Sequence, residues 1–150
     1  MKTRQEPRRR GYHTITPSLC VRDARAAVKF YVAAFDAKVI EQHDEPDGKI
    51  SNVTLRIGDS PLMVSDETSQ HALDHAHEGW PRSPHWAGEP SASMYIYVPD
   101  ADAVVARAVE AGATVIAPVQ DREWGDRLGG FRDPFGHIWN VATHVAELAH

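Results

Sequence analysis

The sequence contains one cysteine, Cys20, and no long apolar run. A single cysteine excludes an internal disulfide and a cysteine-rich zinc site, and it is compatible with a reducing compartment. A membrane helix needs roughly 18 consecutive apolar residues, and a signal peptide needs an apolar segment after the N-terminus. Neither pattern is present, so we expect a globular cytoplasmic protein with no membrane partner.

Positive charge is scarce after the first ten residues. The formal net charge is -5 at pH 7, which argues against general affinity for nucleic acid. The opening MKTRQEPRRR holds five basic residues and one acid, but nothing apolar beyond Met1. A nucleic-acid or membrane arm is conceivable there. We expect instead that residues 1–11 form a solvated, disordered tail, because the segment has no apolar side chain with which to dock.

The chain does contain an internal repeat. Val21-x-Asp23-Ala24 returns as Val98-x-Asp100-Ala101, 77 positions later, and each copy then runs into Val-Ile. Alternating residues before the motif predict a strand, and the Asp is placed to cap the N-terminus of a helix. Further strands follow each helix, with a Gly-rich link through WGDRLGGFRD in the second copy. The pattern predicts strand, helix and three strands, twice over.

This organisation predicts an α+β protein of two βαβββ units. We place the first unit at residues 12–67 and the second at 92–148, separated by a polar connector at 68–91. A length of 150 residues with 42% hydrophobic content suits one compact domain, or two small halves that share one core.

The paired units and the segment WGDRLGGFRDPFGHIWNVATH resemble the vicinal oxygen chelate superfamily, and within it the PhnB-like branch. This superfamily includes glyoxalase I, bleomycin-resistance proteins and extradiol dioxygenases. The resemblance covers about residues 12–148. It implies a cupped mixed β-sheet with helices outside and a homodimer, but no single reaction, because one fold can host several functions.

The resemblance also implies four positions for metal ligands, on the first and last strand of each unit. Metal-using members carry His or Gln on the first strands and usually Glu on the last. Here those positions hold Thr16, Ser93, Val64 and Asn140. None is a strong ligand for a divalent ion, so we expect no metal cofactor. A metal-dependent lyase, isomerase or dioxygenase with non-standard ligands is the alternative.

Histidines gather in the connector instead. His71, His75 and His77 could bind nickel or zinc adventitiously, and on a helix the first two would share a face. Nearby Pro and Gly favour a solvated loop. His137 lies where a turn enters a strand, and we expect it to make a structural hydrogen bond rather than act in catalysis.

Strand alternation predicts which side chains line the cup. On the predicted cup face, Arg56 could hold a carboxylate or phosphate through two N–H bonds. Trp124, Asp126 and Arg127 could form a loop over the mouth. Alternatively, Asp126 and Arg127 could only stabilise the Gly129-Gly130 turn. No histidine is predicted beside Cys20, which argues against a nucleophilic thiol. The predicted cup face comprises Thr16, Ser18, Cys20, Asn52, Thr54, Arg56, Leu62, Val64, Ser93, Tyr95, Tyr97, Ile138 and Asn140.

This mixture suits a small-molecule pocket, although the same residues could face a wet dimer interface. We therefore expect a metal-free protein that binds a small organic molecule as a homodimer. The ligand-binding residues we predict are Thr16, Arg56, Ser93, Tyr95, Tyr97, Trp124, Arg127 and Asn140. An enzyme that uses His137 or a tyrosine for proton transfer, and a structural dimer with an empty cup, remain alternatives.

Overall fold

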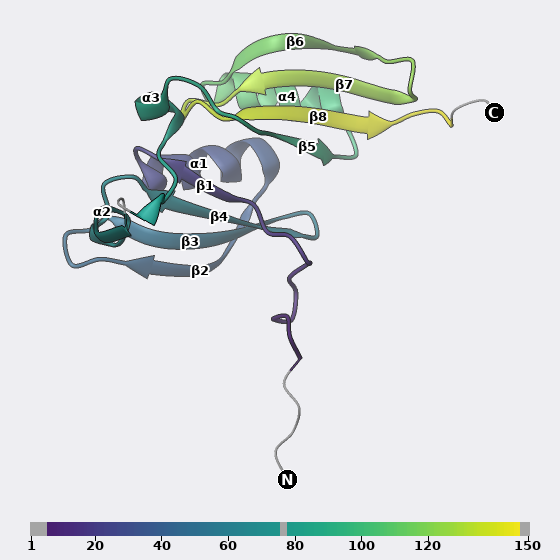
Figure 1. The fold of residues 1–150 in the computed structure, drawn as a ribbon. Coiled ribbons are helices and arrows are strands. Elements are labelled where there is room, and N and C mark those ends of the chain that lie inside the picture. The colour runs from purple at the N-terminus through teal and green to yellow at the C-terminus, as the bar shows by residue number, and fades with distance from the viewer. Residues whose placement is uncertain (1–5, 76–77, 148–150) are drawn as a thin grey trace.

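The computed structural model describes residues 6–75 and 78–147, which form two βαβββ units joined by a connector (Figure 1). The first unit contains β1 (Ser18–Val21), α1 (Ala24–Phe35), β2 (Lys38–Asp44), β3 (Ile50–Ile57) and β4 (Ser60–Asp66). The second contains β5 (Ser93–Tyr97), α4 (Ala101–Glu110), β6 (Thr114–Asp121), β7 (Asp126–Arg132) and β8 (Ile138–His144). The predicted α+β class and the tandem repeat are confirmed.

Each unit folds its strands into one mixed four-stranded sheet. The orders are β1-β4-β3-β2 and β5-β8-β7-β6, so the first and last strands of each unit are neighbours. That pair is parallel in both units, and all other pairs are antiparallel. The helix after the first strand provides the crossover that parallel pairing needs.

The aspartates of the repeated motif cap the two long helices as predicted. Asp23 Oδ1 accepts a hydrogen bond from the Ala26 backbone N–H at 3.1 Å, and Asp100 Oδ1 accepts one from Ala103 at the same distance. Both caps have extended backbone angles, the non-helical conformation typical of an N-cap residue. An Asp at this position satisfies an N–H group that has no partner within the helix.

The two units share a single hydrophobic core. Phe35 of α1 packs on Trp139 of β8 at 4.7 Å between ring centroids, and on Phe131 of β7 at 5.9 Å. The strand residues that alternation assigned to the helix side all join or border this core: Leu19, Val21, Val53, Leu55, Ile57, Met94, Ile96, Val98, Trp139 and Val141. The opposite faces, here called the outer faces, point away from it.

The structure corrects the predicted positions of Leu62 and Val64. Both were assigned to the cup, but they are 3% and 0% exposed and belong to the core. In the antiparallel β3–β4 pair, Val64 lies opposite Val53, so both side chains are on the helix side. Met63 occupies the outer face instead. A shift of one residue in the predicted register moves a side chain to the opposite face.

Two other predicted elements also differ. The Gly-rich stretch is strand β7 rather than a link, and Gly129 lies within the strand rather than in a turn. A Cβ at Gly129 would lie 2.5 Å from Val119 Cγ2, so the close approach of β6 requires glycine. The connector contains two short helices, α2 (Gln70–His75) and α3 (Pro84–Ala87), rather than only loop. No helix in the described part of the chain is long and apolar enough to cross a membrane.

Candidate functional site

Five polar and aromatic side chains converge on the outer face of the second sheet. Tyr95 and Tyr97 are two residues apart on β5, so their side chains lie on the same face. Asp126 is the first residue of β7, and it pairs with His144, the last residue of β8. Trp124 lies in the turn that precedes β7. We call Tyr95, Tyr97, Trp124, Asp126 and His144 the tyrosine cluster.

Asp126 is the centre of the tyrosine cluster and is only 2% exposed. Its Oδ2 accepts hydrogen bonds from the hydroxyls of Tyr95 at 2.6 Å and Tyr97 at 2.8 Å. Its Oδ1 lies 3.0 Å from Nδ1 of His144. The Tyr95 hydroxyl also accepts a bond from the Trp124 indole N–H at 3.1 Å. The buried carboxylate thus fixes two phenol groups and, through Tyr95, an indole.

The aromatic rings of the tyrosine cluster are nevertheless exposed. Tyr95 and Trp124 are each 44% exposed and Tyr97 is 63% exposed. Large aromatic side chains with hydrogen-bonded polar ends are typical of binding surfaces, because they combine contact area with fixed orientation.

The hydrogen bonds of the tyrosine cluster shift the pKa values of its members. The Tyr95 hydroxyl, which donates to the carboxylate, lowers the pKa of Asp126. The bond to Asp126 raises the pKa of His144 above its ordinary value and that of Tyr97 to about 12. Burial, and then the Asp126 carboxylate, raise the pKa of Tyr95. Both phenols therefore stay protonated at neutral pH and do not act as bases.

The superfamily's metal positions lie beside the tyrosine cluster and in the first unit. Asn140 Nδ2 donates to Ser93 Oγ at 3.3 Å, so these two predicted residues are neighbours. Thr16 precedes β1 and is half-buried. Ser18 and Tyr95 are equivalent in the two units, being 77 positions apart. Ser18 pairs with Met63, and Tyr95 pairs with Asn140. The last-strand position of the first unit that corresponds to Asn140 is therefore Met63, not Val64.

A divalent metal does not fit the four side chains at these positions, which are those of Thr16, Met63, Ser93 and Asn140. Two hydroxyls, one amide and one thioether provide neither a carboxylate nor an imidazole, the ligands that zinc, manganese and iron sites need. In the described ranges, 6–75 and 78–147, no group of three or more His, Cys, Asp or Glu residues is arranged to hold a metal ion. These positions therefore support no metal-dependent chemistry.

Arg56 lies apart from the tyrosine cluster, near the end of β3. It borders an open cleft of about 740 Å³ between the two units, which also reaches Tyr95 and Tyr97. Its guanidinium has no hydrogen bond or ion pair to any residue that the structure describes. The structure thus brings three predicted residues to one cleft, with Arg56 on one wall and the tyrosines on the other.

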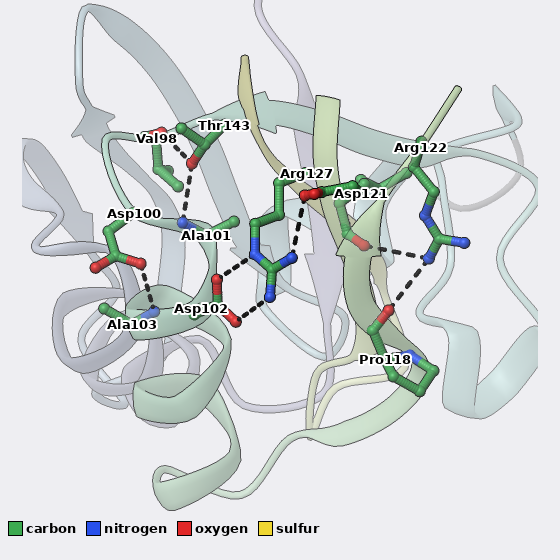
Figure 2. Close-up of polar contacts among 11 residues, drawn as sticks. Val98, Asp100, Ala101, Asp102, Ala103, Pro118, Asp121, Arg122, Arg127 and Thr143 are labelled. Carbon is green, nitrogen blue, oxygen red and sulfur yellow. Dashed lines mark hydrogen bonds and ion pairs between the residues drawn. The ribbon is translucent and has the colours of Figure 1, made fainter. Parts of the chain in front are cut away.

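Arg127 points the opposite way from Asp126. Adjacent strand residues alternate faces, and the Arg127 guanidinium lies on the helix side, where it bonds Asp102 at 2.7 and 3.1 Å and Asp121 at 3.1 Å (Figure 2). These ion pairs connect α4, β6 and β7. The geometry therefore favours the structural interpretation of Arg127 over contact with a ligand on the outer face.

His137 makes the structural hydrogen bond that the sequence predicted. Its Nε2 lies 2.9 Å from the backbone oxygen of Cys20, and the side chain is buried. This bond joins the two units and places a histidine ring near Cys20, which the sequence did not predict. Burial, with a further contribution from Glu67, raises the pKa of the Cys20 thiol to about 11, so the thiol is protonated at neutral pH.

His71 and His75 share a face of α2, with ring centroids 4.6 Å apart, and both rings contact Trp80. His75 also pairs with Glu78 at 2.8 Å. His77, the third histidine of the predicted group, lies outside the described residues.

His144 is the member of the tyrosine cluster that sequence reasoning missed. Asn140, Ala142 and His144 alternate onto the same face of β8, so the spacing contains the signal. The partner could not be inferred, because the contact depends on the β7–β8 register, which pairs His144 with Asp126.

Tandem βαβββ units, each with parallel first and last strands in a mixed four-stranded sheet, define the class of fold. The chain belongs to the Glyoxalase/Bleomycin resistance protein/Dioxygenase superfamily, whose family model matches residues 11–141.

Relatives extend this assignment over most of the chain. An uncharacterized protein of Mycobacterium bovis is 38% identical over 134 residues, covering 89% of this chain and 85% of the relative. The crystal structure of TioX from Micromonospora sp. ML1 is similar with a TM-score of 0.65 and 26% identity, over 87% of this chain and 98% of TioX. A PhnB protein from Bacillus cereus shares the fold, with a TM-score of 0.62 and 15% identity over 87% and 99% of the chains.

Proposed function

We propose that the protein binds a small organic molecule on the outer face of the second sheet, through the tyrosine cluster and without a divalent metal. The observation that carries this proposal is the Asp126 carboxylate, which is buried yet holds three exposed aromatic side chains in fixed positions. A binding site needs an apolar or aromatic wall with a few oriented polar groups.

The chemistry of the tyrosine cluster favours binding over proton transfer. Both phenol protons are directed to Asp126, so the hydroxyl oxygens face a ligand as acceptors. The raised pKa values of Tyr95 and Tyr97 oppose a role as general bases near neutral pH. A planar ligand with N–H or O–H donors is complementary to such a surface.

The outer face of one chain is open, and we propose that a second copy of the chain covers it in a homodimer. A two-fold symmetric dimer presents the same patch on both subunits, so one pair of sheets can enclose the ligand from both sides. Exposed Tyr97 and Trp124 are side-chain types that are enriched in interfaces.

A ligand screen with matched variants tests this proposal. Planar aromatic compounds that carry N–H or O–H donors are screened by thermal shift, and hits are confirmed by calorimetry. Tyr97→Phe should weaken a hit about fivefold to tenfold, since one net hydrogen bond contributes roughly 1 kcal/mol. Tyr12→Phe is the control, because its hydroxyl lies outside the cluster. Equal affinity of wild type, Tyr97→Phe and Trp124→Ala would contradict the proposal.

Metal content separates this function from the metal-dependent alternative. Untagged protein is chelated, exposed to nickel, zinc, manganese and iron, and its metal stoichiometry is measured beside a His71→Ala/His75→Ala/His77→Ala variant. We expect either no retained metal or metal that is lost in the variant. A tight site that survives in the variant would place the enzyme alternative first.

A further inference from the structure

A cleft between the two units lies next to the tyrosine cluster but differs from it in chemistry. One wall is the β3–β4 turn of the first unit, residues 56–62, and the other is β5 with the following residues, 94–99. Its volume of about 740 Å³ is within the range of sites for small organic ligands.

The interior of the cleft is apolar. Phe35, Leu62 and Trp139 border it, and all three belong to the shared core. Ile96 and Val98 line the opposite wall from β5 and are only partly buried. Ile96 and Val98, unlike the nearly buried Phe35, Leu62 and Trp139, keep apolar surface in contact with water, and such surface favours a ligand with a hydrocarbon or aromatic body.

Charged side chains border the same cleft, and they are of both signs. Lys38 is engaged by Asp36, whose Oδ1 lies 3.0 Å from Nζ. Asp59 accepts a hydrogen bond from Ser60 at 3.0 Å and lies 3.8 Å from His13. These groups therefore have partners within the protein.

Two arginines on the cleft have no such partner. Arg56 comes from β3 of the first unit and Arg107 from the last turn of α4 in the second. Within residues 6–75 and 78–147, neither guanidinium makes a hydrogen bond or ion pair. By contrast, Arg9, Arg25, Arg82 and Arg127 all pair with carboxylates.

We propose that this cleft is a second binding site, specific for an amphiphilic organic carboxylate whose apolar body lies between the units and whose carboxylate meets Arg56 and Arg107. A guanidinium offers two parallel N–H donors that match a carboxylate. The apolar walls supply the larger part of the affinity, and the two cations select the charge of the ligand. Because the arginines come from different units, the ligand would bridge the units.

The site is separable from the tyrosine cluster by mutation. The phenol hydroxyls of Tyr95 and Tyr97 are committed to Asp126, and the cleft supplies its own cations. Trp124→Ala, which alters the tyrosine cluster at a residue that does not line the cleft, should therefore leave carboxylate binding unchanged, whereas an arginine variant should reduce it.

Decanoate is the probe, and calorimetry with the intact chain is the measurement. We expect saturable binding with one decanoate per chain. Affinity should rise from hexanoate to decanoate by about fourfold per methylene, the value for burying a CH₂ group. Decanol and decylamine, which share the apolar body but lack the anion, should bind at least tenfold more weakly.

Arg56→Ala and Arg107→Ala should each weaken decanoate binding about tenfold to a hundredfold, the range for a hydrogen bond to a charged group. Arg22→Ala is the matched control, because Arg22 is exposed and lies outside the cleft. The expected unfolding temperature of all three variants is that of the wild type. Arg56→Lys and Arg107→Lys should retain part of the affinity.

Three results would overturn the proposal. Decylamine that binds as tightly as decanoate would show that the cations do not select charge. Unchanged affinity in both alanine variants would place decanoate elsewhere. Binding of many decanoate molecules per chain without saturation would indicate non-specific adsorption.

Discussion

Asp133 and Asp126 are both buried carboxylates, but their partners differ. Asp133 is 3% exposed and accepts hydrogen bonds from the buried side chains of Tyr31 and Trp139, at 2.6 and 2.9 Å. Asp126 is equally buried, yet its partners are exposed aromatic residues and His144. Asp133 stabilises the core, whereas Asp126 positions side chains that contact solvent.

The Asp126–His144 contact makes stability depend on pH at the residue scale. Hydrogen bonds from the His144 ring to Asp126 and Glu147 raise the pKa of His144, so the folded state favours the protonated imidazole. This stabilisation is fully present below the unfolded pKa of about 6.5 and is lost as pH rises through the higher folded value. We therefore expect the wild type to lose its stability advantage over His144→Gln as the pH rises above about 6.5, through the raised pKa of the folded state.

Thermal unfolding of both proteins below and above pH 6.5 measures the effect. His85→Gln is the control, since His85 is exposed and makes no hydrogen bond in the described structure. The Asp126 carboxylate, whose pKa is lowered, acts in the other direction, because its stabilisation is lost in acid below about pH 4. A stability difference that stays constant from pH 6 to 9 would contradict the role assigned to His144.

At the element scale, β7 shows how a sheet tolerates glycine. Gly129 faces the core side opposite Val141, and β6 bulges toward it at Val119. A strand normally disfavours glycine, but here the side chain of Val119 occupies the space that a Cβ would need. The irregularity of β6 at Val119 therefore depends on the absence of a side chain at Gly129.

Gly129→Ala should lower the free energy of unfolding by about 1–3 kcal/mol, the range for inserting a methyl group into a packed site. The added Cβ would lie 2.5 Å from Val119 Cγ2 and 3.2 Å from Val119 Cα. Denaturant unfolding measures the loss. Removing the obstructing methyls in a Gly129→Ala/Val119→Ala double variant should restore part of it, and a lack of coupling between the two substitutions would refute the steric explanation.

At the scale of the whole molecule, aromatic contacts hold the two units together. Phe30, Tyr31 and Phe35 of α1 contact Phe131, Phe135 and Trp139 of the second unit. Tyr31 adds a hydrogen bond to Asp133, and His137 returns one to Cys20. The two units thus share one core, to which both contribute aromatic side chains.

Phe35→Ala should destabilise the protein by about 3–5 kcal/mol, because it removes a ring that packs on Phe131 and Trp139. In the wild-type protein, we expect the two units to unfold together in a single transition, because neither unit has a separate core. Far-UV circular dichroism and tryptophan fluorescence in denaturant report secondary structure and the core. Val32→Ala, an exposed position of the same helix, is the control. Two separate wild-type transitions would contradict the shared core.

The sequence by itself determined the repeat, the helix caps and most of the buried strand faces. Asp23 and Asp100 cap because an Asp before an amphipathic run can satisfy free N–H groups by local contacts alone. The helix-facing residues follow from strict alternation along each strand. The resemblance to the superfamily, applied to the same sequence, implied that Thr16, Ser93 and Asn140 hold ligand positions and so named their donor types.

Tertiary structure alone decided the register and the partners. The face of Leu62 and Val64 depended on the antiparallel register of β3 with β4, and a one-residue error reversed it. The contacts of Asp126 with Tyr95 and His144 join residues 31 and 18 positions apart. Arg56 and Arg107 meet one cleft only because the units pack together. Such contacts arise from strand pairing and core packing, which no local pattern encodes.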